Sequence, residues 1–409
     1  MSAVMSNNAT SSMSPYGRSG TRSRSLQMDG ILIMAVAAIL LVSAVMVTSA
    51  SISIASKETG DAFYYLKRQL VFIALGALAC MIAARIPSRV WQRLHVPLLL
   101  AAIVMLVVVL VPGIGATVNG SRRWVRMGIM NFQVSELARV FVLAFIAGYI
   151  THRQKELKET FKTTAMPLAV LVVIAMLLLL EPDFGATAVL MTTSVALLFL
   201  GGMRLRYFFV LVAGAAALMG LVAIAAPYRM KRLVGCIDPW ADPFGSCYQL
   251  VQSEIAIGRG EWFGVGLGSS VQKLFYLPEA HTDFVFAVIA EEFGFIGVLC
   301  LLCLYGVVVW RVLRISRMAA EANMVFQAFI AASFGIWMGL QTFINIGVNM
   351  GLLPTKGLTL PMLSNGGSSL LVALAWLGVV LRIHHEASMS GRSAMPKSAS
   401  KALAGKAKA

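Results

Sequence analysis

Charged residues are scarce in this sequence. They make up 13% of its 409 residues, whereas a soluble domain carries about a quarter. The apolar segments also lack the two-residue alternation that marks the strands of a membrane β-barrel. These absences exclude an ordinary soluble enzyme and a barrel. Apolar spans that are not barrel strands must be helices, because only a helix satisfies its own backbone hydrogen bonds in lipid.

Cysteine is also rare, with five residues in the whole chain. Three of them (Cys80, Cys300 and Cys303) fall within apolar runs, where they are ordinary packing residues. Cys236 and Cys247 lie in a long polar loop and could form a disulfide if that loop is outside the cytoplasm. Nothing in the cysteine pattern indicates a metal site.

Apolar runs of about 20 residues recur along the chain, which is 58% hydrophobic. They predict an all-α polytopic membrane protein with about ten transmembrane helices. A cleavable signal peptide is not expected, because residues 1–28 are polar and the first apolar run is long enough to remain in the membrane. The expected spans are 30–53, 69–85, 96–113, 134–151, 165–180, 184–201, 207–226, 283–310, 323–348 and 370–384.

The distribution of Lys and Arg predicts the orientation. Every short basic turn falls on one side if both termini are cytoplasmic. This places a large periplasmic loop, 227–282, between the seventh and eighth helices. The membrane domain is expected at 29–385, between disordered basic cytoplasmic tails at 1–28 and 386–409.

The net charge of +16 does not indicate a nucleic-acid partner, because the basic residues sort by membrane side and form no single patch. The basic tails instead suit anionic lipids or cytoplasmic proteins. We find no convincing internal repeat, which weakens the case for a transporter built from inverted repeats.

Asp283 lies where the large loop re-enters an apolar helix, and Glu291 and Glu292 follow about two turns deeper. Carboxylates inside an apolar span are costly and suggest a function, whereas an acid at the membrane border stays charged easily. Asp283 is therefore a candidate general base. The alternative is a helix cap or a charge pair, since Thr282-Asp283 is also a good helix start.

Two further polar segments face the same outer side. The first, Asn119-Gly-Ser-Arg-Arg-Trp-Val-Arg, is too polar to cross the membrane, and Glu136 and Arg139 follow it. Its Arg123 suits phosphate oxygens, although lipid headgroups would attract the same side chain. Glu136 and Arg139 are three residues apart and could simply pair. The second, Glu181-Pro-Asp-Phe-Gly, is a tight turn whose two acids, Glu181 and Asp183, could form a pyrophosphate–metal site or a structural site.

The segment from Leu353 to Ser369 carries two prolines, several hydroxyls and a lone cation, Lys356. It suits an irregular segment that lines a polar cavity, and the amides around Ser368 could bind an anion. An ordinary turn at the start of a helix would account for the same sequence pattern. Together these features predict an outward-facing cleft for a molecule with a lipid tail and a pyrophosphate. The cleft suits an enzyme or a transporter.

The chain resembles the SEDS family of membrane proteins over about 30–385. The strings that carry the resemblance are DPWADPFGSCYQL at 238–250, GRGEWFGVGLG at 258–268, LPEAHTDF at 277–284 and SNGGSS at 364–369. The first string and QKLFYLPEA at 272–280 are more similar to the division branch of the family than to its elongation branch. An elongation enzyme is therefore the nearest alternative.

The resemblance implies a septal glycosyltransferase of the bacterial inner membrane that polymerises lipid II and works with a class B penicillin-binding protein and other divisome proteins. It implies that Asp283 is the essential loop aspartate. Arg123, Glu136 and Lys356 match other positions of the family's motifs. Arg139 stands where Lys is usual, and Asn365 stands where Tyr is frequent. Cys236 and Cys247 are not expected in the family.

The hypothesis from these residues is that Asp283 accepts a proton from the acceptor's 4-hydroxyl as undecaprenyl pyrophosphate leaves. Arg123, Lys356 and a divalent cation, Mg²⁺ or Mn²⁺, would then stabilise the pyrophosphate. A lipid II transporter is the rival from another class, and a scaffold that only recruits the synthase is a third interpretation.

Overall fold

A computed structural model describes residues 27–394, except 119–120, 129, 160, 205, 208, 210–212, 215–238, 242, 246 and 355–356. Seven of its helices are long and apolar enough to cross a membrane. They are α1 (Gly30–Thr59), α2 (Tyr64–Arg85), α5 (Val134–Glu159), α6 (Phe161–Leu180), α11 (Val285–Glu321), α12 (Val325–Asn349) and α13 (Gly367–Ala394). Two shorter apolar helices are α4 (His95–Leu110) and α7 (Phe184–Leu200).

These seven long and two shorter helices coincide with nine of the ten expected spans. The remaining span, 207–226, lies largely outside the described residues, as do the N-terminal tail and Cys236. The predicted helical membrane fold is thus confirmed, whereas the helix count stays a prediction. Short elements complete the described chain, namely α3 (Ser88–Arg93), a 3-10 turn (Pro239–Ala241) and α10 (Tyr248–Gly260).

Two boundaries differ from the sequence predictions. The helix α11 continues to Glu321, past the expected end at 310, and Arg311 within it pairs with Asp29 at the start of α1. The helix α13 continues to Ala394, although a disordered tail was expected from 386. Glu386 fixes that extension, because it accepts hydrogen bonds from Arg382 one turn earlier and from Ser88 of α3.

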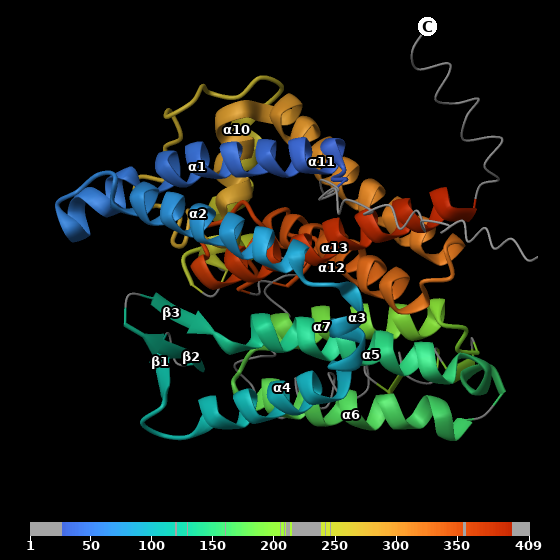
Figure 1. The fold of residues 1–409 in the computed structure, drawn as a ribbon. Helices are drawn as coiled ribbons and strands as arrows, with labels where there is room; N and C mark the ends of the chain where they lie inside the picture. Colours follow the sequence, from blue (N-terminus) through green and yellow to red (C-terminus); the bar gives the residue numbers. More distant parts are fainter. Residues whose placement is uncertain are drawn as a thin grey trace, which may run out of the picture.

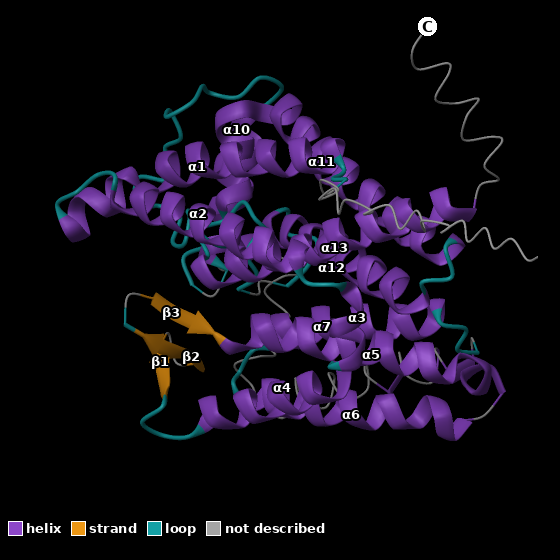
Figure 2. Cartoon of the chain, viewed as in Figure 1, coloured by secondary structure: helices purple, strands orange, loops and turns teal. Residues whose placement is uncertain are grey.

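A small antiparallel sheet is the only β structure in the described part of the chain (Figure 2). It contains β1 (Gly115–Val118), β2 (Ser121–Met127) and β3 (Met130–Gln133), with β2 in the centre. Trp124 pairs with Gln133, and Val125 pairs with Phe132. The polar segment that cannot cross the membrane thus satisfies its backbone by strand pairing.

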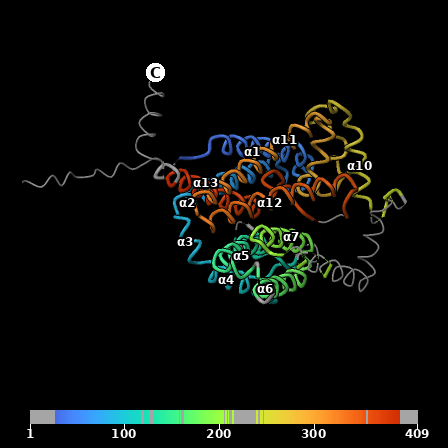
Figure 3. Tube along the Cα trace, turned by 90° about the vertical axis from the view of Figure 1, so that its right-hand side faces the viewer, coloured from blue at the N-terminus to red at the C-terminus, as the bar shows by residue number. Residues whose placement is uncertain are grey.

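The helices form two groups with α12 and α13 between them (Figures 1 and 3). The group of α4, α5, α6 and α7 lies on one side, with the sheet at its end. The group of α1, α2, α10 and α11 lies on the other side. The central pair packs against both groups, since α12 contacts α7 and α11 while α13 contacts α2 and α5.

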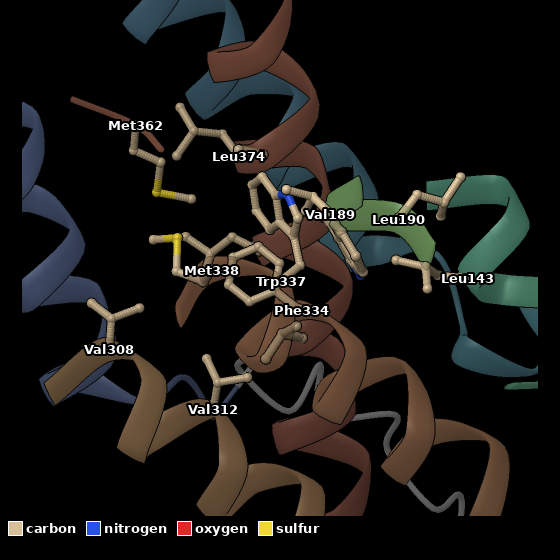
Figure 4. Packing of buried hydrophobic residues seen from close by; sticks show 14 of the residues in the cluster. Leu143, Val189, Leu190, Val308, Val312, Phe334, Trp337, Met338, Met362 and Leu374 are labelled. Atoms are coloured by element: carbon tan, nitrogen blue, oxygen red, sulfur yellow. The ribbon is translucent and has the colours of Figure 1, made fainter. Parts of the chain in front are cut away.

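Large apolar side chains fill the space around α12 (Figure 4). Phe334 and Trp337 of this helix pack with Trp376 of α13, and the two tryptophan rings stack at a centroid distance of 5.4 Å. Leu143 of α5 and Val312 of α11 reach the same region from the two helix groups. The two groups therefore share one hydrophobic core with α12 at its centre.

The helix α11 is broken at Gly294, which has φ 66° and ψ −164°. The break leaves backbone groups free, and the segment 261–266 binds them. Val265 and Gly266 donate to the carbonyls of Glu291 and Glu292, at 2.9 and 3.1 Å, and Phe295 donates to Glu261 at 2.8 Å. The long loop before α11 is thereby joined to the helix by backbone hydrogen bonds.

The carboxylates of Glu291 and Glu292 strengthen this junction. Glu291, fully buried, pairs with Arg259 at 2.9 Å and accepts from Ser270 at 2.5 Å. Glu292 pairs with buried Lys273 at 2.7 Å. The ion pairs thus offset the desolvation penalty of two acids inside an apolar helix, because a buried charge is tolerated when it is paired and hydrogen-bonded.

We predict that Gly294→Ala destabilises the protein. The added Cβ would lie 2.4 Å from the backbone nitrogen of Gly264, and this backbone conformation is essentially restricted to glycine, at a cost of about 1–3 kcal/mol. Gly306→Ala in the same helix is the matched control, because a Cβ there meets nothing within 4 Å. Thermal unfolding in detergent should show a lower Tm for the first variant alone. Equal Tm values would contradict the role of the break.

Candidate functional site

A polar cavity of about 320 Å³ lies where the sheet, α5, α7, α12 and the loops before α11 and α13 meet. It contains six of the seven residues predicted from the sequence: Arg123, Glu136, Arg139, Asp183, Asp283 and Ser368. Lys356 lies outside the described residues, and its neighbour Gly357 lines the cavity. Segments that are up to 245 positions apart in sequence, from Arg123 to Ser368, thus converge on one space.

Asp283 lies two residues before α11 and does not cap it. Phe284 occupies the cap position and makes no side-chain cap hydrogen bond. The backbone carbonyl of Asp283 accepts from Asn345 at 3.0 Å and from Asn349 at 3.2 Å. The structure therefore does not support the helix-cap alternative, and Asp283 lines the cavity.

The surroundings of Asp283 favour its neutral form more than water does. The pKa of Asp283 is raised to about 7, chiefly by burial and next by the negative charge of Glu279, while the positive charge of Arg123 opposes the shift. A carboxyl group with a pKa near neutrality is suited to accept a proton during a reaction at neutral pH. The side chain keeps partial access to the cavity, so a substrate can reach it.

Asp183 anchors the turn between α6 and α7 to the sheet. Its Oδ1 accepts from the backbone N–H of Ala186 at 3.0 Å and caps α7. Its Oδ2 accepts from Gln133 and Ser135, each at 3.1 Å, and Arg123 lies 3.6 Å away. Asp183 thus has a structural role in the turn and also holds Arg123 at the cavity.

Glu136 and Arg139 pair on α5 at 3.2 Å, as their three-residue spacing allows. Arg139 is almost fully buried, donates to Gln341 at 3.0 Å and lies over the ring of Trp337, 5.4 Å from its centroid. The pair fixes its two charges at the wall of the cavity. At this position a guanidinium meets a carboxylate, an amide and an aromatic face together, which suits Arg better than Lys.

Ser368 is buried in the first turn of α13, which begins at Gly367. The preceding Asn365 donates its backbone N–H to the carbonyl of His281 at 3.0 Å, and both Asn365 and Gly366 line the cavity. The segment is therefore an ordinary helix start that also opens onto the cavity. A helix N-terminus at this place favours negative charge.

Glu181 adds a second acid close to the site. It is fully buried, and neither carboxylate oxygen has a hydrogen-bond partner among the described residues. Burial raises its pKa to about 8, and Asp183 contributes. Glu181 is therefore mostly neutral at pH 7, so it adds little charge to the cavity.

Sequence reasoning missed the amides that hold the site. Gln341, Asn345 and Asn349 recur at every fourth residue of α12, and they are 1%, 1% and 0% exposed. Their spacing was visible in the sequence, because residues four apart share one face of a helix. Glu279 and Gln133 were also missed, although both line the cavity.

The described residues contain no group of three or more Asp, Glu, His or Cys arranged to hold a metal ion. Two acids of the cavity, Glu136 and Asp183, are engaged by Arg139, Arg123 and a backbone N–H instead. We therefore assign no chemical step to a divalent cation. The arrangement offers one acid of near-neutral pKa, two arginines and a helix N-terminus, which can accept a proton and hold an anion.

The fold and the cavity define a multi-pass membrane protein with a polar site suited to acid–base chemistry on an anionic substrate. The family model described as "Cell cycle protein", FTSW_RODA_SPOVE, matches residues 30–389. The chain belongs to this family, which confirms the resemblance to the SEDS proteins.

Individual proteins support the division branch. The chain is 51% identical over 365 residues to a protein of Thioalkalivibrio sulfidiphilus named "Probable peptidoglycan glycosyltransferase FtsW", with 89% of this chain and 91% of the relative covered. A Pseudomonas fluorescens protein of the same name is 49% identical over 373 residues, with 91% of each chain covered.

Solved structures agree with the fold. A chain from work on "structural coordination of polymerization and crosslinking by a peptidoglycan synthase complex" matches with a TM-score of 0.73 at 30% identity, covering 88% of this chain and 99% of that one. The rod shape determining protein RodA of Thermus thermophilus matches with a TM-score of 0.65 at 31% identity, covering 88% and 98%.

We predict that Asp283 titrates near pH 7 and that its neighbours tune this value. Glu279→Gln removes a negative charge and should shift the titration to lower pH, whereas Arg123→Gln removes a positive charge and should shift it to higher pH. The carboxylic C=O stretch that disappears in Asp283→Asn would follow the titration in infrared spectra. A midpoint near the ordinary value for Asp, about 3.9, would contradict the burial of this group.

Proposed function

We propose that this chain polymerises lipid II into glycan strands as a peptidoglycan glycosyltransferase of the division type. The observation that carries the proposal is the placement of Asp283, with a pKa of about 7, in one cavity with Arg123 and Arg139. The names of the relatives support it. The cavity combines a proton acceptor with groups that bind phosphate oxygens, which is what this reaction requires.

In the proposed reaction the 4-hydroxyl oxygen of the acceptor sugar attacks the anomeric carbon of the donor. The hydroxyl proton passes to the carboxylate of Asp283, and the bond from the anomeric carbon to the pyrophosphate oxygen breaks with its electron pair. Undecaprenyl pyrophosphate leaves, and Arg123 is placed to stabilise its developing charge. Lys356 is assigned the same role from the sequence. Asp283 returns its proton to water before the next addition.

The proposed membrane location and partner proteins follow from the same proposal. A lipid-linked substrate requires a membrane enzyme, and the basic turns favour a site on the periplasmic side of the bacterial inner membrane. The structural similarity to a chain of a peptidoglycan synthase complex supports a crosslinking partner, which we propose is a class B penicillin-binding protein. The relatives of the division type support action at the septum with other divisome proteins.

We predict that Asp283→Asn abolishes polymerisation. Loss of a general base lowers the rate by about 10²–10⁴-fold, whereas the similar shape of Asn preserves the fold. The assay is polymerisation of labelled lipid II by the complex of this chain with its penicillin-binding partner. Asp61→Asn is the matched control, because this exposed acid pairs with Lys67 outside the cavity.

Polymer from wild type and Asp61→Asn, with none from a folded Asp283→Asn, supports the enzyme. Polymer from all three would move the base to another residue. No polymer from any of them, with an intact complex, would contradict the proposed function. A transporter would then be tested by movement of labelled lipid II across vesicle membranes.

A further inference from the structure

The face of α12 that carries Gln341, Asn345 and Asn349 lies against the segments that form the cavity. We define these three residues as the amide ladder. The helix is an apolar membrane-spanning segment, and an amide buried there is costly unless it is hydrogen-bonded. The hydrogen-bond partners of these three amides therefore show which segments they hold in place.

Each amide of the ladder binds a segment that carries cavity residues. Gln341 accepts from Arg139 of α5 at 3.0 Å and donates to the carbonyl of Thr359 at 2.9 Å. Asn345 donates to the carbonyl of Asp283 at 3.0 Å and to that of Leu358 at 2.5 Å. Asn349 donates to the same carbonyl of Asp283 at 3.2 Å.

Asn345 occupies the central position of this network. Its single NH₂ group joins the backbone before α11 to the loop before α13, which are 75 residues apart from Asp283 to Leu358. The side chain does not line the cavity, so it can affect the site only through the backbone that it holds. Gly357, next to Leu358, lies so close to Asp283 that a Cβ on it would be 3.2 Å from the carboxylate.

The chemistry of the acceptors explains why an amide is needed. Two backbone carbonyls converge on one point, and each requires a donor when buried. An NH₂ group supplies two donors, whereas a carboxylate would place oxygen against oxygen and an apolar side chain would supply none. The position thus requires a side-chain NH₂ group, as Asn supplies.

We propose that Asn345 is a positioning residue that fixes Asp283 against the Leu358–Thr359 loop, with Asn349 as a weaker second tie. The inference rests on the proposed function only for its effect on catalysis. Its effect on the structure of the loop before α11 is independent of any activity.

The test compares Asn345→Leu with Gln327→Leu in the complex with the penicillin-binding partner. Gln327 is the matched control, because it is also a buried amide of α12 but donates to Ser88 of α3, away from the cavity. Displacement of a catalytic group by about 1 Å can cost about 100-fold in rate. We expect Asn345→Leu to lower kcat about 100-fold with KM nearly unchanged, and Gln327→Leu to lower thermal stability alone.

A second measurement keeps the proposal testable if lipid II is not polymerised. Hydrogen exchange of the backbone amides in 277–284 should be about tenfold faster in Asn345→Leu than in wild type, because the loop loses its tie to α12. Asn349→Leu should give a smaller increase, since Asn345 still holds the same carbonyl. Gln327→Leu should leave exchange in this loop unchanged.

These readouts separate the two proposals. An inactive wild-type complex with faster exchange in Asn345→Leu would remove the proposed function and support the positioning role. An active complex in which Asn345→Leu retains kcat within about twofold, or exchanges its loop no faster than Gln327→Leu, would overturn the positioning role.

Discussion

The break in α11 is the constraint on which the position of Asp283 depends. A continuous helix would satisfy its own backbone and offer no attachment to the long loop before it. At Gly294 the series of helical hydrogen bonds is interrupted, and residues of 261–266 hydrogen-bond to the backbone groups that the break leaves free. The short helical segment from Val285 is thereby fixed at the break, while Asn345 and Asn349 hold the carbonyl of Asp283 next to its start. The acid is held by a rigid element although it belongs to a loop.

Most buried acids on this side of the molecule are compensated by a cation or by hydrogen bonds. Glu291, Glu292 and Glu136 each pair with a cation. Asp183 has backbone and side-chain donors as well as Arg123. Asp283 differs from these acids, because its carboxylate has no ion-pair or hydrogen-bond partner among the described residues and its pKa rises to about 7. Glu181 is also unpaired, but it does not line the cavity, so Asp283 is the uncompensated acid that a substrate in the cavity can meet, as is typical of a site where that acid does the chemistry.

Much of this arrangement was accessible from the sequence, for definite reasons. The spans were predicted because each is a long apolar run, and the cavity residues were predicted because their motifs share the outer side. The sheet was missed because strand pairing within a short, Arg-rich segment leaves a weak local signal. The break at Gly294 was missed because a single glycine in an apolar run is ordinary, and only the packed loop reveals its conformation. The amide ladder could be seen as a spacing, but its acceptors are backbone carbonyls of distant segments, which no local pattern identifies.

The length of α11 gives a depth for the site. Trp310, on the side of α11 away from Asp283, lies against the guanidinium groups of Arg311 and Arg314, as expected where a helix leaves the lipid. A hydrocarbon layer of about 30 Å corresponds to about 20 helical residues, so the opposite boundary falls near Glu291. Asp283 then stands among the headgroups, at the level where the phosphates of a lipid-linked sugar already reside. A substrate can meet this acid by diffusing sideways in the adjacent leaflet, with its tail left in the bilayer.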